Sequence, residues 1–165
     1  MRIIFGILFL TLISSRCSVQ YTTNGTDTGD AETVTVKIFN VKAPLAPPSL
    51  GQIFTEDLQE ILLSQTKLDV VTNSKDLVFD GSITNFTITP VGIQAGDVAA
   101  QNRLTITVMV NYINKLDPKK GFEKSFTRFA DYPSSQDINS VQDGLIEEIH
   151  EQITQDIINA SLSNW

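Results

Sequence analysis

The side chains best suited to nucleophilic or acid–base chemistry at neutral pH are one cysteine and one histidine. The sequence has no serine elbow, no phosphate-binding loop and no zinc-protease helix motif. His150 lies in an acidic segment between Glu147 and Glu151, so we expect a solvated surface imidazole. The residues therefore predict no catalytic site, no metal and no cofactor. Hydrolysis by two carboxylates alone remains an enzymatic alternative.

Cys17 stands at the end of an apolar segment that opens the chain. Arg2 and the apolar run 3–13 are typical of a secretory leader, and the run is shorter than the roughly 20 residues that span a hydrocarbon core. Serines before a cysteine resemble the processing site of bacterial lipoproteins, although Arg16 departs from that pattern. We therefore expect residues 1–16 to be a lipoprotein-type signal peptide and Cys17 to be the lipid attachment site. The alternative is an inert free thiol.

Charge and composition limit the partners and the number of domains. The net charge is −7, and without residues 1–16 ten Lys and Arg stand against nineteen Asp and Glu, a net charge of −9. Because phosphate backbones would be repelled, we expect no nucleic acid partner. Residues 17–31 would form the acylated cysteine and a flexible linker rich in Thr, Gly, Asn and Asp. Residues 32–165 are enough for one domain with an ordinary core.

Hydrophobic periodicity predicts strand, helix, strand in the first half of this domain. Residues 32–40 alternate as a half-buried strand, and residues 68–71 form a short strand. Ser49 opens a helix between them, with Gln52 at the spacing of a capping box. Two strands joined by a helix favour a parallel pair. The apolar stripe of the helix is predicted to be Leu50, Ile53, Phe54, Leu58, Ile61 and Leu62.

The second half predicts three strands and a helix. Residues 77–89 alternate with a slip near Asn85 that indicates a β-bulge, and residues 102–116 form the longest strand. A turn at DPKKG leads into a strand over residues 122–132, so these three strands should form an antiparallel meander. The final amphipathic helix is predicted over residues 138–160.

This order, β-α-β-β-β-β-α, predicts an α/β two-layer sandwich with both helices packed on one face of a mixed sheet. The opposite face would then be left uncovered by the chain. It is predicted to be polar and rich in Thr, which suits docking on another polar surface. Residues predicted on this face include Arg103, Thr105, Thr107 and Asn111.

Basic residues gather around the predicted DPKKG hairpin. Lys115, Lys119, Lys120 and Lys124 surround its tip, and Arg103 and Arg128 lie in the adjacent strands. Such a cluster is either an exposed, soluble tip or a site that captures an anionic group such as a phosphate. The residues alone leave both readings open.

Several segments resemble the LptE family of lipopolysaccharide-assembly lipoproteins. The resemblance runs from about residue 32 to residue 165 and includes AAQNRLTI, FADYPSSQ, FTEDLQEILLSQTKLDVV and DLVFDGSITNFTITPV. It implies a two-layer α/β sandwich that is lipid-anchored in the outer membrane on the periplasmic side. It also implies a partner, the LptD β-barrel, whose lumen the protein plugs while it helps lipopolysaccharide insertion.

On this resemblance the chain has no enzymatic role, and it is held at the membrane through acyl chains. The barrel-contact face would include Arg103, Thr105, Thr107 and Asn111. No basic ligand residue is carried over from the family. The basic residues of the hairpin themselves motivate the hypothesis that lipopolysaccharide is bound there, by Lys119, Lys120, Lys124 and Arg128. The alternative is a free-standing periplasmic lipid-binding or shuttle lipoprotein, which would need an enclosed apolar cavity.

Overall fold

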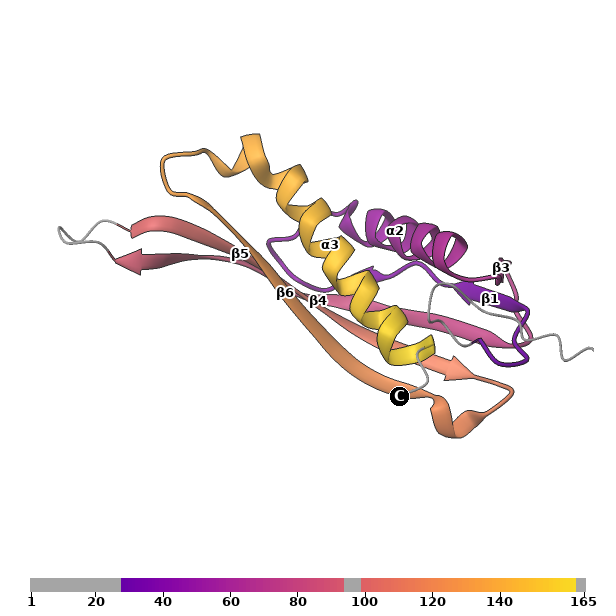
Figure 1. Cartoon of the computed structure of the whole chain (residues 1–165). Coiled ribbons are helices and arrows are strands. Elements are labelled where there is room, and N and C mark those ends of the chain that lie inside the picture. Colours follow the sequence, from indigo (N-terminus) through magenta and orange to yellow (C-terminus); the bar gives the residue numbers. More distant parts are fainter. Residues whose placement is uncertain (1–27, 94–98, 163–165) are drawn as a thin grey trace, which may run out of the picture.

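The computed structural model describes residues 28–93 and 99–162, so Cys17 and the predicted signal peptide lie outside the described residues. The described chain forms two layers, a twisted sheet and a pair of helices (Figure 1). The elements are β1 (Thr33–Val36), β2 (Asn40–Val41), α2 (Leu50–Gln65), β3 (Asp69–Val70), β4 (Leu77–Ile93), β5 (Ala99–Asn114), the 3-10 helix η1 (Pro118–Lys120), β6 (Phe122–Pro133) and α3 (Ile138–Leu162).

The sheet has the strand order β3-β1-β4-β5-β6, and β2 pairs with β4 beside this path. β1 runs parallel to both β3 and β4, whereas β4, β5 and β6 form an antiparallel meander. These pairings confirm the predicted parallel pair and the predicted meander. The register of β4 and β5 shifts between Ile83 and Asn85, which confirms the predicted bulge and keeps Ile83 and Phe86 both in the core.

The predicted strand over residues 32–40 is interrupted in the structure. β1 ends at Val36, and the backbone N–H of Phe39 donates to the hydroxyl of Thr55 on α2 at 3.0 Å. Gly51 permits this close approach, because a Cβ there would lie 2.1 Å from the carbonyl oxygen of Phe39. The start of α2 therefore presses directly on the chain between β1 and β2.

Two details predicted for α2 are wrong. Ser49 takes the N-cap position in a helical conformation and makes no side-chain cap, while the Gln52 amide donates instead to Glu56 at 2.9 Å. A preceding turn, in which Leu50 N–H donates to the Pro47 carbonyl, begins the helix instead. Ile53 was predicted to be buried but is 40% exposed.

Both helices pack on the same face of the sheet, α2 against β1, β2 and β3 and α3 against β6 and β5 (Figure 1). The core between the layers is filled by aromatic and aliphatic side chains. Phe39 meets Phe54 edge-on with 4.9 Å between ring centroids, and Phe79 stacks on Tyr112 at 4.8 Å. The predicted two-layer sandwich is thus confirmed. Neither helix of the described residues is long and apolar enough to cross a membrane.

Candidate functional site

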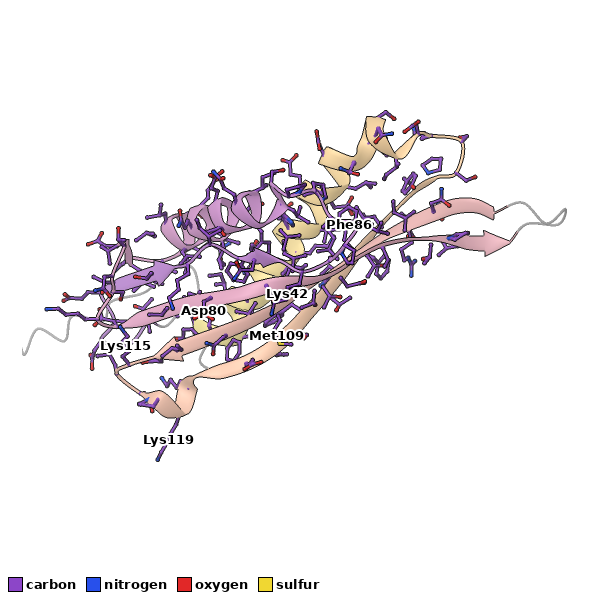
Figure 2. The ribbon with its side chains drawn as sticks, turned by 180° about the vertical axis from the view of Figure 1, so that it is seen from behind. Lys42, Asp80, Phe86, Met109, Lys115 and Lys119 are labelled. Carbon is purple, nitrogen blue, oxygen red and sulfur yellow. The ribbon has the colours of Figure 1, made fainter. Side chains whose placement is uncertain are left out.

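The face of the sheet opposite the helices is the candidate functional site. Figure 2 views the molecule from behind, and the strands there lie in front of both helices. Arg103, Thr105, Thr107 and Asn111 alternate with the buried residues of β5, so all four share this face as predicted. We call this surface the sheet face. Its members on β4, β5 and β6 include Val78, Asp80, Ser82, Asn85, Thr87, Thr89, Arg103, Thr105, Thr107, Met109, Asn111, Ile113, Glu123, Ser125, Thr127, Phe129 and Asp131.

One charged pair crosses between β5 and β6 on the sheet face. The guanidinium of Arg103 donates to both carboxylate oxygens of Asp131, at 2.7 and 2.8 Å, and lies 3.6 Å from the ring centroid of Phe129. Hydrogen bonding by Arg103 lowers the pKa of Asp131 and, in return, the pKa of Arg103 is raised. Both charges therefore have a partner within the protein.

Further cross-strand pairs extend over the sheet face. Lys37 lies 3.3 Å from Asp80, whose other oxygen accepts from the Asn111 amide at 3.1 Å. The hydroxyls of Thr107 and Thr127 bond to each other at 3.0 Å. Because these groups already satisfy one another, the face is polar and largely self-neutralised, the property expected of a surface that can exchange water for another polar surface.

A polar network fixes the rim of the sheet at the start of β1. Asp76 accepts the backbone N–H of Glu32 and both the N–H and hydroxyl of Thr33, and these bonds lower its pKa. Nearby, Lys115 Nζ donates to the Ser74 carbonyl at 2.6 Å. Lys115 therefore holds the turn between β3 and β4, and its ammonium is only partly available for an outside anion.

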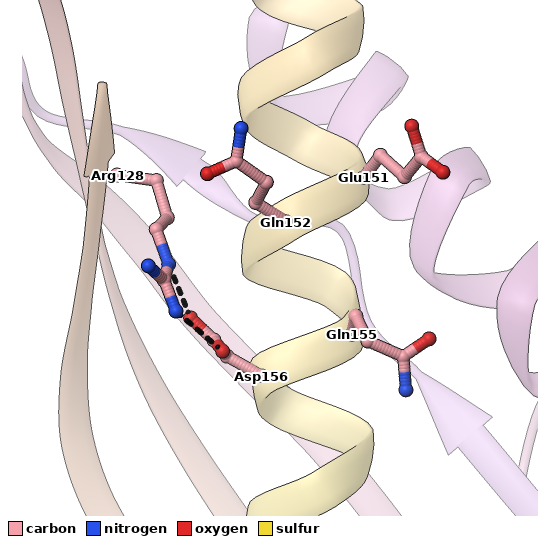
Figure 3. Close-up of a pocket in the computed structure, with 5 residues that line it drawn as sticks. All are labelled: Arg128, Glu151, Gln152, Gln155 and Asp156. Carbon is pink, nitrogen blue, oxygen red and sulfur yellow. Dashed lines mark hydrogen bonds and ion pairs between the residues drawn. The ribbon is translucent and has the colours of Figure 1, made fainter. Parts of the chain in front are cut away.

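The basic residues predicted to bind an anion do not converge on one point. Lys119 and Lys120 are exposed in η1, whose first turn is capped by the Asp117 carboxylate. Lys124 lies over the Phe126 ring at 5.1 Å. Arg128 is held by Asp156 of α3, with hydrogen bonds of 2.7 and 2.8 Å (Figure 3). Lys119 and Lys120 therefore remain as the two cations that project freely.

An open hollow of about 510 Å³ lies at the base of this hairpin. Its apolar wall is formed by Tyr112, Ile113 and Phe122, and Lys115 stands on its rim. It is a surface depression and not an enclosed chamber. A second hollow, of about 460 Å³, lies beside Arg128 and Asp156 on α3.

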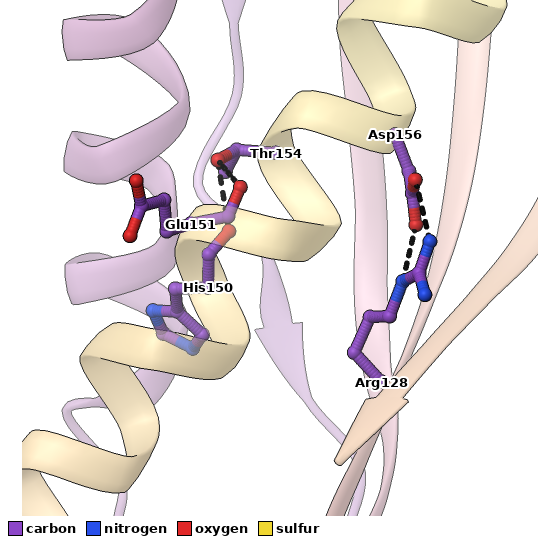
Figure 4. A network of polar contacts seen from close by, with 5 residues as sticks. All are labelled: Arg128, His150, Glu151, Thr154 and Asp156. Carbon is purple, nitrogen blue, oxygen red and sulfur yellow. Dashed lines mark hydrogen bonds and ion pairs between the residues drawn. The ribbon is translucent and has the colours of Figure 1, made fainter. Parts of the chain in front are cut away.

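The prediction for His150 is wrong, because its side chain is fully buried. Nδ1 lies 2.6 Å from the Asp57 carboxylate on α2, and the ring meets Phe54 edge-on at 5.0 Å. Nε2 is buried and has no hydrogen-bond partner among the described residues. His150 therefore joins the two helices from inside. Figure 4 shows His150 on α3 with its neighbours Glu151 and Thr154, whose hydroxyl donates to the His150 carbonyl at 2.8 Å. The spacing of His150 from Ile146, Ile153 and Ile157 places it on the buried stripe, a signal that the sequence did contain.

The chain belongs to the α/β class of two-layer sandwiches, with both helices on one face of the sheet and a polar face on the other side. Within that class, the profile of the lipopolysaccharide-assembly family LptE matches residues 31–161, and the chain belongs to this family. The family is defined by assembly of lipopolysaccharide and not by an enzymatic reaction.

Solved structures share the fold at low sequence identity. The hypothetical protein CT253 from Chlamydia trachomatis is 14% identical with a TM-score of 0.55, over 81% of this chain and 99% of that one. An uncharacterized lipoprotein B from Nitrosomonas europaea is 14% identical with a TM-score of 0.53, over 84% and 86%. A minor lipoprotein from Acinetobacter baumannii is 15% identical with a TM-score of 0.50, over 80% and 96%. No curated protein matches the chain by sequence.

Proposed function

We propose that this chain is a non-enzymatic lipoprotein of the outer membrane that plugs an LptD-type β-barrel from the periplasmic side. In this role it helps the barrel to assemble and to insert lipopolysaccharide into the outer leaflet. The observation that carries the proposal is the sheet face, which is broad, mostly polar and not covered by either helix. The interior of a membrane barrel is polar, so a plug needs a hydrogen-bonding exterior.

The state of the charges on the sheet face favours docking. Burying an unpaired charge is costly, whereas Arg103 with Asp131 and Lys37 with Asp80 are already paired. Thr105 and Thr107 add short side chains that can accept or donate at little cost in rotamer freedom. Phe129 and Ile113 supply apolar contacts, being 46% and 38% exposed.

The packed interior favours a plug over a lipid shuttle. A shuttle must enclose an acyl chain, but the space between sheet and helices is occupied by fully buried side chains such as Phe39, Phe79 and Tyr112. The hollow near the η1 hairpin is open at the surface. Membrane attachment is assigned to acyl chains on Cys17, which would hold the domain at the periplasmic surface.

Substitution on the sheet face tests the docking role. Thr105→Arg introduces a bulky unpaired cation on the sheet face, and we expect co-purification of the β-barrel from detergent-solubilised membranes to fall by about tenfold or more, since unpaired buried charge is strongly unfavourable. Glu148→Arg, on the exposed side of α3, is the matched control and should leave co-purification unchanged. Equal recovery of the barrel with both variants would refute docking through the sheet face.

The η1 hairpin supports a second role, direct contact with lipopolysaccharide phosphates. Lys119 and Lys120 are exposed at its tip, while Lys124 and Arg128 lie further along β6 as secondary contacts. Lys119→Ser together with Lys120→Ser should weaken lipopolysaccharide binding several-fold in a pull-down on immobilised lipopolysaccharide, with the same urea midpoint as the parent chain. Unchanged binding would remove the hairpin from this role.

A further inference from the structure

Among the described residues, the sheet has open edges on β2, β3, β6 and the part of β4 beyond β2, and they differ in how they are protected against pairing with another chain. β2 and β3 are only two residues long each, which is too short to receive a partner strand. β4 continues past its pairing with β2 at Ile83, but there the bulge before Asn85 and the proline Pro90 interrupt it. The edges of β2, β3 and β4 therefore carry recognised protections.

The edge of β6 is not short, and neither a bulge nor an internal proline interrupts it. β6 is twelve residues long, and its register with β5 runs without a shift from Tyr112↔Phe122 to Gln101↔Pro133. Its only proline, Pro133, is at the end. In the described part of the chain, β5 is its only strand neighbour, and Figure 1 shows β6 as the outer strand of the meander. A row of main-chain N–H and C=O groups therefore faces outward.

The two basic side chains of β6 that could protect this edge, Lys124 and Arg128, instead contact other side chains of the protein. Lysine and arginine side chains commonly protect a free edge by crossing it. Here Lys124 rests over the Phe126 ring, and Arg128 is bound bidentately to Asp156 on α3. Both side chains lie on the helix side of β6, where their partners in β5, Val110 and Ile106, are buried.

A second copy of this chain fits the β6 edge poorly. Antiparallel self-pairing about a two-fold axis places residues of the same face opposite one another. Of its two longest registers, one sets Glu123 opposite Asp131 and the other sets Arg128 opposite its own copy. Like charges directly opposite are destabilising. The edge is therefore better suited to a different polypeptide.

The sheet-face residues of β6 define what that polypeptide should contain. From one end to the other they are Glu123, Ser125, Thr127, Phe129 and Asp131, that is, an acid at each end and hydroxyl and aromatic groups between them. Favourable cross-strand neighbours are basic residues opposite the acids, and Thr or β-branched residues opposite the centre. Glu123 is exposed and forms no ion pair within the described residues, so it is the acid most available to such a partner.

We propose that the outer edge of β6 is a binding site for an extended segment of another protein, which adds to the sheet as an antiparallel strand with a basic residue opposite Glu123. Main-chain hydrogen bonds along the edge supply affinity, and the alternating side chains supply the choice of partner. The binding groups are the main-chain edge and the β6 side chains that β6 contributes to the sheet face. The proposal goes beyond the plug function, which rests on the whole sheet face.

A synthetic nine-residue peptide, designed to pair with β6 from Glu123 to Asp131, tests the site. The probe is Lys-Thr-Val-Thr-Thr-Val-Thr-Thr-Lys, and the control peptide has its fifth and sixth residues, Thr and Val, replaced by Pro. With the purified full chain we expect saturable binding by fluorescence anisotropy and slowed amide exchange at alternate residues of β6 by NMR, since alternate N–H groups face outward. The proline peptide should bind about tenfold more weakly or not at all, because main-chain bonds are lost.

Three variants of the chain sharpen the result. Glu123→Lys should weaken peptide binding about threefold, because it places like charges opposite each other. Glu148→Lys on α3 should have no effect. Thr105→Arg should bind the peptide normally, so failure of the plug proposal and failure of the β6 proposal are distinguishable.

Two results would overturn the proposal. One is the absence of peptide-dependent protection at β6, or protection at β3 or β4 instead. The other is concentration-dependent protection of β6 in the chain alone, accompanied by a dimer in sedimentation, which would make a second copy the occupant.

Discussion

The helix layer and the sheet face of this sandwich differ in how many of their acidic side chains are paired with a cation. The helices α2 and α3 contain eight Asp and Glu and no Lys or Arg. Among the described residues, only two of these acids contact a basic side chain, Asp156 with Arg128 and Asp57 with the His150 imidazole. Of the three acids on the sheet face, Asp80 and Asp131 each hold a cation and only Glu123 does not. Unpaired carboxylates favour water, whereas paired ones can be covered at lower cost. The helix layer is therefore built to stay solvated, and the sheet face to be covered.

The two sides of the sheet also differ in how tightly they are packed. On the helix side, a methyl group at Gly81 would lie 2.1 Å from the Met109 carbonyl and 2.7 Å from the Phe39 ring. Thr105 on the sheet face is only half-buried. Any substitution that enlarges the helix side should therefore be far more costly than one that trims the sheet face.

The largest expected effect follows from this difference in packing. Gly81→Ala should lower the free energy of unfolding by about 3 kcal/mol, since backbone and ring must both move. Thr105→Ala should change it by no more than about 0.5 kcal/mol. Urea unfolding followed by circular dichroism measures both, and similar losses in the two variants would contradict the comparison.

A smaller effect on the free energy of unfolding is expected from substitutions on the inner and outer sides of the helix layer. Asp57 and Glu56 are neighbours on α2, but only Asp57 contacts buried His150. Because an ionised carboxylate can only accept, Nδ1 carries the proton and would lose its acceptor in Asp57→Ala. We expect a loss of about 1–3 kcal/mol in the free energy of unfolding.

Glu56→Ala is the matched control, because Glu56 is exposed and bonds only to the exposed Gln52 amide. Its expected change is below about 0.5 kcal/mol. If both variants unfold at the same urea concentration, the Asp57–His150 contact contributes nothing to the packing of α2 on α3.

Much of the sheet was predictable because alternation in sequence follows directly from burial of one face. Leu104, Ile106, Val108 and Val110 are all fully buried, and the slip near Asn85 marks a real bulge. These patterns are local, because the alternation within each strand reflects which of its own side chains are buried. The shared face of Arg103, Thr105, Thr107 and Asn111 was predictable for the same reason.

The errors come from contacts between segments distant in sequence. His150 was predicted to be solvated from the acids beside it, but Asp57, 93 residues away, supplies its partner. The partner of Arg128, Asp156 on α3, was likewise not predicted, while the contact of Arg128 with lipopolysaccharide stays a prediction. Neighbouring residue types cannot reveal such partners.

The smallest expected effect is a loss of stability at low pH. It tests whether the carboxylates that the fold stabilises in their charged form lie on the sheet side of the molecule. The pKa values of Asp76 and Asp131 are both lowered from the ordinary 3.8 by their hydrogen bonds. A lowered folded-state pKa contributes stability that is complete above the unfolded value and is lost as the pH falls through the folded value. The urea midpoint should therefore drop below about pH 4, and Asp76→Asn should make that drop shallower.

Glu148→Gln is the control for this acid dependence, because Glu148 is exposed on α3 and forms no ion pair within the described residues. Its profile of urea midpoint against pH should follow that of the parent chain. A shallower profile for Glu148→Gln than for Asp76→Asn would mean that the helix layer, and not the sheet side, holds the carboxylates that folding keeps ionised. The contrast between a solvated helix layer and a neutralised sheet face would then be lost, since acid sensitivity follows the carboxylates whose charged form the fold stabilises.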